Sequence, residues 1–84
     1  MAMASTEPIL DRVLARLRRE FPTARSVRPT DRLMGGVIDS MGLMNLVTVL
    51  EAEFGVTLDD ADLTLKNFRD ATAIAAMIER RLTP

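Results

Sequence analysis

Cysteine and histidine are both absent from the 84 residues of this chain. Their absence excludes disulfide bonds, zinc sites built from Cys and His, and acid–base catalysis by His. Tryptophan and tyrosine are absent too, and three phenylalanines are few for a protein that stacks nucleic-acid bases. The chain also lacks an apolar run long enough to span a membrane, and residues 1–7 lack the regions of a secretory signal. We therefore predict a cytoplasmic protein with no metal site that binds neither nucleic acid nor membrane.

What the chain does contain is enough apolar sequence to fold. Hydrophobic residues make up 48% and charged residues 27%, a balance typical of a folded domain. A chain of this length forms one domain, and its core is too small to surround a deep active-site pocket. We predict a loose terminus over residues 1–5 and a single domain over residues 6–84. This size favours a compact helical bundle, and we expect it to be monomeric.

Charge is distributed unevenly along the chain, although the net charge is only −1. Residues 1–32 hold seven arginines against four acidic residues, whereas residues 33–68 hold six acidic residues against Lys66 alone. The acidic middle is expected to repel nucleic acid and to favour a basic protein partner. The arginines over residues 16–19 are expected to form a solvated helix face.

Three segments repeat apolar residues at three- and four-residue spacing, which predicts amphipathic helices over about 7–20, 40–53 and 71–82. Thr6 and Asp70 are placed to cap the first and last helices, and Gly55 to end the second. The residues expected on the buried faces are Leu10, Val13, Leu14, Leu17, Leu43, Leu46, Val47, Leu50, Phe54, Ile74, Met77, Ile78 and Leu82.

A long connection, residues 22–39, separates the first two helices, and its apolar residues are expected to pin it to the core. These residues are Val27, Leu33, and Val37 or Ile38. Residues 59–63 resemble a single short helical turn. The predicted fold is therefore all-α, a small four-helix bundle with three longer helices and one short helix.

The most informative stretch runs from Gly35 to Val56 and reads GGVIDSMGLMNLVTVLEAEFGV. Here the chain resembles the acyl and peptidyl carrier protein family. The resemblance begins at Asp31-x-Leu33 and is sharpest over residues 36–41. It continues through the Leu-Glu-x-Glu-Phe-Gly-Val run of residues 50–56, fades towards residue 75, and covers most of the chain after residue 30. An Asp-Ser pair alone means little, but the same pair opening an amphipathic helix after a long loop is far more specific.

In that family the serine after the aspartate carries 4'-phosphopantetheine, so the resemblance implies this role for Ser40. A serine at a helix N-terminus suits a phosphodiester, because unpaired N–H groups and the helix dipole favour an anion. Without the flanking pattern, Asp39 or Ser40 would be interpreted only as an N-cap. Asp39 is expected to cap the helix, and to help position a metal ion or basic group during arm transfer. Gly36 is expected to supply a backbone turn near Ser40, where a side chain would obstruct.

The second predicted helix has another stripe, formed by Met41, Met44 and Thr48. This stripe cannot face the same core as the leucines of the helix. It is either partly buried against the long connection or exposed as a docking strip, since methionine adapts to several partners. The helix is the usual docking face in carrier proteins, so the resemblance favours the exposed alternative.

The chain also departs from one branch of the family. Fatty-acid carrier proteins bear acidic residues just after the serine and one turn later, where this chain has Gly42 and Asn45. The sequence is therefore more similar to aminoacyl, peptidyl and specialised-metabolism carriers. The implied partners are a phosphopantetheinyl transferase, an acyl- or aminoacyl-loading ligase or transferase, and downstream biosynthetic enzymes.

Other functions receive less support from the sequence. An armless helical docking module of the same fold is the main alternative. A DNA-binding domain rests only on the arginine-rich first third, because the last helix lacks the Arg, Asn and Gln cluster of a recognition helix. The available Asp, Glu, Ser and Lys residues form no base–nucleophile arrangement, so we do not expect an enzyme.

Overall fold

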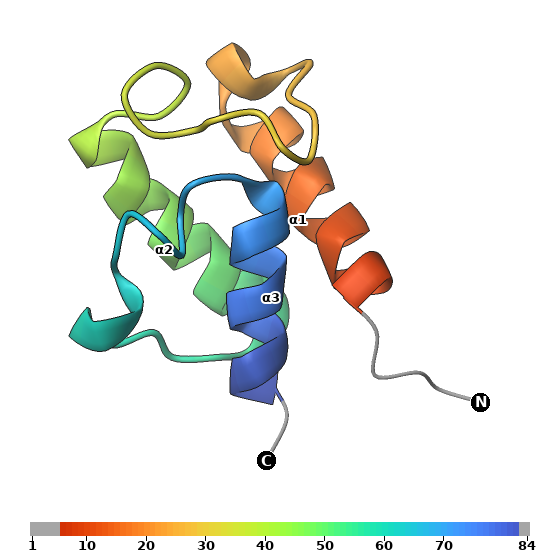
Figure 1. Ribbon diagram of the computed structural model, residues 1–84, viewed down its shortest axis with the longest axis vertical. Coiled ribbons are helices and arrows are strands. Elements are labelled where there is room, and N and C mark those ends of the chain that lie inside the picture. The colour runs from red at the N-terminus through yellow and green to blue at the C-terminus, as the bar shows by residue number, and fades with distance from the viewer. Residues whose placement is uncertain (1–5, 83–84) are drawn as a thin grey trace.

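The computed structural model describes residues 6–82 of the chain, and the predicted loose terminus, residues 1–5, lies outside the described residues. The architecture is all-helical (Figure 1). Three α-helices are joined by connections that each contain one 3₁₀ turn, and no strand occurs among the described residues. In chain order the elements are α1 (Thr6–Glu20), η1 (Pro22–Ala24), α2 (Ser40–Phe54), η2 (Asp60–Asp62) and α3 (Ala71–Leu82).

The three longer helices confirm the periodicity of the sequence, with ends within one residue of those predicted. Gly55 ends α2 in the left-handed conformation, at φ 67°, as predicted for a glycine stop. Thr6 is the first residue of α1 rather than the residue before it, so the cap position of that helix falls outside the described residues.

A fourth helix is not confirmed, because residues 59–63 form only the 3₁₀ turn η2. The turn is closed by its own side chains. The carboxylate of Asp59 accepts the N–H of Ala61 at 3.1 Å, and that of Asp62 accepts the N–H of Asp59 at 3.0 Å. Leu63 then leaves the helical region, at φ −86° and ψ 68°, and the turn stops there.

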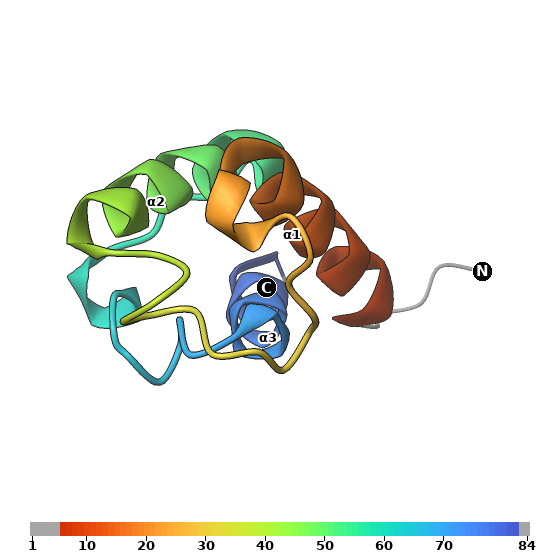
Figure 2. The same ribbon diagram turned by 90° about the horizontal axis from the view of Figure 1, so that it is seen from above.

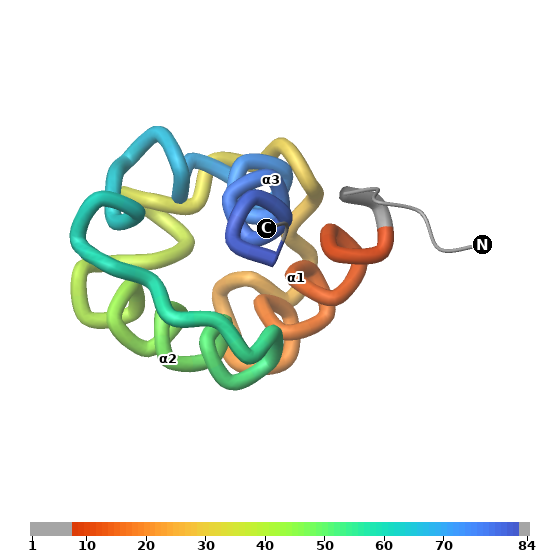
Figure 3. Tube along the Cα trace, turned by 90° about the horizontal axis from the view of Figure 1, so that it is seen from below, coloured from red at the N-terminus to blue at the C-terminus, as the bar shows by residue number. Residues whose placement is uncertain are grey.

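Helix α3 occupies the centre of the molecule, with α1, α2 and both connections arranged around it (Figures 2 and 3). Its closest helical neighbour is α1. Ala71 and Ala75 are fully buried, and their small side chains leave room for the surrounding elements. The core also contains Val13, Leu14, Leu17, Ala24, Val27, Leu33, Ile38, Leu46, Val47, Leu50, Phe54, Leu58, Phe68, Ile74, Met77 and Ile78.

Leu82 was predicted to point inward, and this prediction is wrong, because the residue is 46% exposed. It belongs to the last turn of α3. The buried face of that helix ends with Ile78, four residues earlier, so the periodic pattern runs on past the last core contact.

The long connection between α1 and α2 is pinned as predicted, with Val27, Leu33 and Ile38 buried. Hydrogen bonds add to this anchoring. The Leu33 N–H donates to the Arg69 carbonyl at 2.9 Å, and the N–H and hydroxyl of Thr72 both donate to the Pro29 carbonyl, at 3.1 and 3.2 Å. The connection is therefore attached to the start of α3.

None of the helices described over residues 6–82 combines the length and the apolar character needed to cross a bilayer.

Asp70 should be an important cap of α3. Its side chain is almost fully buried and accepts the Ala73 N–H at 2.8 Å. We expect Asp70→Ala to reduce the free energy of unfolding by about 1 kcal/mol, which corresponds to a fall of roughly 4–8 °C in Tm. Circular dichroism melts at 222 nm measure this change. Asp70→Asn should retain most of the stability, and Asp60→Ala, at an exposed position, should leave Tm nearly unchanged. Equal losses in Asp70→Ala and Asp60→Ala would contradict the capping role.

Glu53 should make the stability depend on pH in the acid range. A hydrogen bond from Arg12 and the nearby charges of Arg12 and Arg16 hold the pKa of the Glu53 carboxyl below its ordinary value of 4.5. A lowered folded-state pKa contributes stability that is present above the ordinary pKa and is lost as pH falls through the lowered one.

We therefore expect Glu53→Gln to be less stable than the parent at neutral pH, with the two proteins converging as pH falls below 4.5. Urea midpoints across this range measure the effect. Asp60→Asn serves as the control, because Asp60 is exposed and forms no ion pair within residues 6–82. A constant difference between Glu53→Gln and the parent would show that the ion pairs do not cause the pH dependence.

Candidate functional site

Ser40 is the first residue of α2, and its side chain is exposed. No hydrogen bond joins its hydroxyl to another residue in the described part of the chain. Asp39, the residue before it, has extended backbone angles, φ −95° and ψ −174°, so the chain enters the helix at the serine. The Ser40 hydroxyl is therefore accessible and uncommitted at a helix N-terminus.

Asp39 caps α2, as predicted. Its Oδ1 accepts the Gly42 N–H at 2.7 Å, and its carbonyl accepts the Leu43 N–H at 2.9 Å. The carboxylate thereby occupies one of the free backbone donors at the start of the helix. Its expected part in arm transfer stays a prediction.

Two contacts just before Ser40 fix the position of the serine. Ile38 is 2% exposed, and its N–H donates to the Leu33 carbonyl at 2.9 Å. The Val37 carbonyl accepts the hydroxyl of Thr23 at 2.6 Å, which ties the end of the connection to η1. Ser40 therefore follows a buried anchor by only two residues and is held although its own side chain is exposed.

The turn before the site depends on a different glycine from the one predicted. Gly35 has φ 90°, whereas the φ of Gly36 is not positive. A Cβ added at Gly36 would also meet nothing within 4 Å, so a side chain there obstructs nothing. The backbone role expected of Gly36 therefore belongs to Gly35. Met34 and Ile38, which flank the turn, form an isolated β-bridge.

Gly42 is a further site residue, whose structural role the sequence reasoning missed. A Cβ there would lie 3.1 Å from Ile38 Cγ2, 3.2 Å from Asp39 Oδ1 and 3.6 Å from Phe21 Cε1. The absence of a side chain lets the first turn of α2 sit against both the buried anchor and the capping carboxylate. A signal was present in the sequence, because glycine inside a helix costs about 1 kcal/mol relative to alanine and requires a packing reason.

The second stripe of α2 is exposed rather than buried against the long connection. Met41 is 81% and Met44 58% exposed, and Thr48 is also exposed. The Thr48 hydroxyl donates back to the Met44 carbonyl at 3.2 Å within the helix. We call Met41, Met44 and Thr48 the methionine strip. It begins one residue after Ser40, and the segment from Ser40 to Leu50 carries no charged side chain.

Within residues 6–82, no group of three or more acidic side chains is placed to hold a metal ion.

Comparison with known proteins identifies the family of the chain. A family model described as a phosphopantetheine attachment site matches residues 11–78. The chain is 32% identical over 77 residues to aminoacyl carrier protein 2 of Bradyrhizobium diazoefficiens, with 88% of this chain and 86% of the relative covered. It is 31% identical over 61 residues to aminoacyl carrier protein 1 of the same organism, with coverages of 73% and 68%.

The helical fold and the family match over most of the chain together define the class of protein. The chain belongs to the acyl and peptidyl carrier protein family, and its cofactor is 4'-phosphopantetheine. The residues at the start of α2 fit this group, because they offer an exposed hydroxyl beside a helix N-terminus that favours a phosphodiester anion.

The two neighbouring glycines provide a matched test of the turn before the site. We expect Gly35→Ala to destabilise the protein by at least about 1 kcal/mol, because a side chain is strained at a positive φ. Gly36→Ala should be neutral or slightly stabilising, since it restricts the unfolded chain without a clash. Thermal melts of both variants measure the difference. A larger loss for Gly36→Ala would contradict the assignment of the turn to Gly35.

Proposed function

We propose that this chain holds acyl or aminoacyl groups as thioesters on 4'-phosphopantetheine attached to Ser40 and delivers them to partner enzymes. The observation that carries the proposal is the exposed Ser40 hydroxyl at the first residue of α2, directly after the capping Asp39. This position lies inside the segment matched by the family model. The attached group supplies the thiol that forms the thioester, and we propose that the chain catalyses no reaction itself.

The residues around Ser40 suit a substrate of a separate transferase. The helix N-terminus favours the phosphate that would be linked to the hydroxyl, and the buried Ile38 holds the serine in place. Asp39 and Gly36, which precede Ser40 in the chain, are included in the proposed site. Asp39 keeps the first turn of α2 formed, and Gly36 is an exposed residue of the turn before the serine, with open space around it.

The carried group is proposed to belong to specialised metabolism, of the polyketide, nonribosomal peptide or aminoacyl type, rather than to bulk fatty-acid synthesis. The support is the uncharged first part of α2, with Gly42 and Asn45 where fatty-acid carriers are acidic. The names of the two relatives, aminoacyl carrier proteins, favour the aminoacyl type.

The proposed partners are a phosphopantetheinyl transferase, a loading ligase or acyltransferase, and downstream biosynthetic enzymes. The methionine strip beside Ser40 is the proposed docking surface, because its exposed flexible side chains adapt to several partners. A tethered arm raises the effective concentration of the carried group at each partner. We propose that residues 6–84 act as one monomeric carrier domain in the cytoplasm.

Attachment at Ser40 is tested by intact mass after incubation with coenzyme A, Mg²⁺ and a broad-specificity phosphopantetheinyl transferase. The parent should gain one phosphopantetheine, and Ser40→Ala should gain none, because it lacks the accepting hydroxyl. Ser40→Ala should also keep the parent Tm, since the hydroxyl makes no hydrogen bond within residues 6–82.

Ser26→Ala is the matched control, because Ser26 is also exposed but lies outside a helix. It should be loaded as completely as the parent. Loading of Ser40→Ala would eliminate this site. A folded parent that no active transferase loads would favour the second candidate, an armless docking module, for which the exposed methionine strip is the supporting observation.

A further inference from the structure

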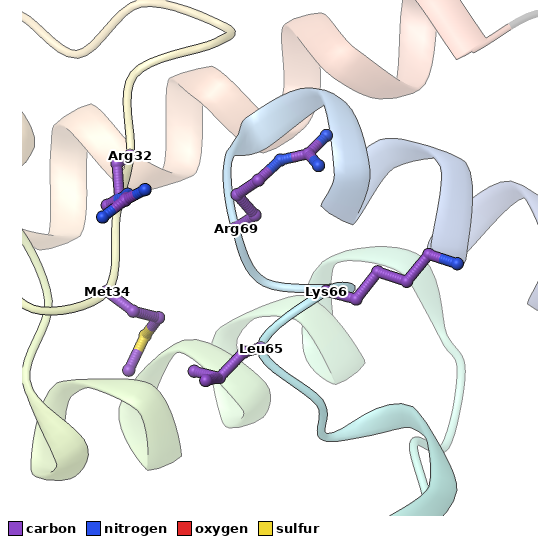
Figure 4. Close-up of a pocket in the computed structure, with 5 residues that line it drawn as sticks. All are labelled: Arg32, Met34, Leu65, Lys66 and Arg69. Carbon is purple, nitrogen blue, oxygen red and sulfur yellow. The ribbon is translucent and has the colours of Figure 1, made fainter.

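A half-open pocket of about 370 Å³ lies between two segments that are distant in the sequence. Arg32 and Met34 line it from the connection before α2, and Leu65, Lys66 and Arg69 line it from the connection before α3 (Figure 4). The side chains of Met34 and Leu65 extend towards each other across it. Leu65 is 74% exposed, so this apolar side chain of the pocket is largely open to solvent. We call these five residues the basic pocket.

One side of the basic pocket, Arg32 and Met34, is close to Ser40 along the chain. Met34 forms its β-bridge with Ile38, and Ile38 precedes Ser40 by two residues. A bridge partner lies about 5 Å away and each of the two further residues adds at most about 4 Å, so the Met34 and Ser40 Cα atoms are within roughly 13 Å. Met34 is therefore near enough to Ser40 for one partner protein to reach both residues.

The charge of the pocket is positive and largely uncompensated. Arg32 and Lys66 have no ion pair with any residue from 6 to 82, and Arg69 pairs only with the adjacent Asp70. No carboxylate lines the pocket. Several acidic residues elsewhere, in contrast, form ion pairs with arginines. Glu53 pairs with Arg12 and Arg16, and Arg81 pairs with Asp59 and Asp62.

We propose that the basic pocket is a docking site for a partner protein, which inserts an apolar side chain between Met34 and Leu65 and places carboxylates against Arg32, Lys66 and Arg69. The inference rests on the proposed function, since it assigns a partner surface to the Ser40 site. The proposed partner surface is acidic, whereas the acidic middle of the sequence suggests a basic partner.

The arrangement of the cations favours a protein over a small anion. The Lys66 side chain extends away from Met34 and Leu65, and that of Arg69 points in a different direction from Arg32 (Figure 4). The three charges thus spread over a surface and do not converge on one point, as recognition of a single phosphate or carboxylate would require. The exposed Leu65 is likewise better covered by a protein surface than by a small ligand.

The test is a titration of the ¹⁵N-labelled protein, without its arm, with synthetic peptides in which two leucines are flanked by glutamates. We expect saturable shifts of the amides of Arg32, Met34, Leu65, Lys66 and Arg69, and binding that weakens as salt is raised. A peptide with glutamine in place of every glutamate should bind several-fold more weakly. Because the arm is absent, the Ser40→Ala protein should give the same result.

The matching variant is Arg32→Gln with Lys66→Gln, which should weaken binding of the glutamate peptide roughly two- to tenfold, as expected for two exposed ion pairs. The control is Arg19→Gln with Arg25→Gln. This variant changes the net charge equally but leaves the pocket intact, so it should bind like the parent. Arg32→Glu with Lys66→Glu should instead prefer a peptide with lysines in place of the glutamates.

Four results would overturn the proposal: no shifts at the pocket with millimolar peptide, equal binding of the glutamate and glutamine peptides, equal weakening in the control variant, or saturable shifts of the same amides with inorganic phosphate alone. Each is independent of loading at Ser40. A protein that is loaded but fails this test keeps the proposed function and loses only the basic pocket as a docking site.

Discussion

The connection between α1 and α2 lacks a regular helix or strand after η1, yet it positions Ser40, the proposed attachment site. Its side chains anchor it at Val27, Leu33 and Ile38, and its backbone is bonded to the start of α3. Arg18 of α1 adds two hydrogen bonds to the Val27 carbonyl, at 3.1 and 2.7 Å. Loss of these attachments would free the approach to α2, because the contacts inside the connection, such as the Met34–Ile38 bridge, do not join it to the helices.

The same constraint explains why an exposed serine is compatible with a defined position. The burial of Ile38 and the cap from Asp39 fix the first turn of α2, while Gly42 leaves the space that this close approach needs. The side chain of Ser40 is exposed, and its hydroxyl makes no hydrogen bond within residues 6–82. Its hydroxyl is therefore available to a partner enzyme, and the order of the site comes from its neighbours.

Ion pairs with arginines neutralise several of the acidic side chains. The carboxylate of Glu53 at the end of α2 is held by two arginines of α1, and Arg81 bridges the two aspartates that close η2. Each exposed pair contributes little to stability. Together they neutralise much of the acidic middle and leave Arg32 and Lys66 as unpaired charges within residues 6–82. The surface potential near the site therefore differs from that suggested by counting charges along the sequence.

The sequence by itself determined the three α-helices, the caps at Asp39 and Asp70, the stop at Gly55 and the family pattern around Ser40, because periodicity and capping act over a few neighbouring residues. The tertiary structure alone decided the features that join distant segments. It attached the connection before α2 to the start of α3, and it left Leu82 beyond the last core contact. It also brought together the basic pocket, whose two halves are some thirty residues apart. Such contacts depend on how the chain folds back on itself, and the local spacing of residues in the sequence does not predict this.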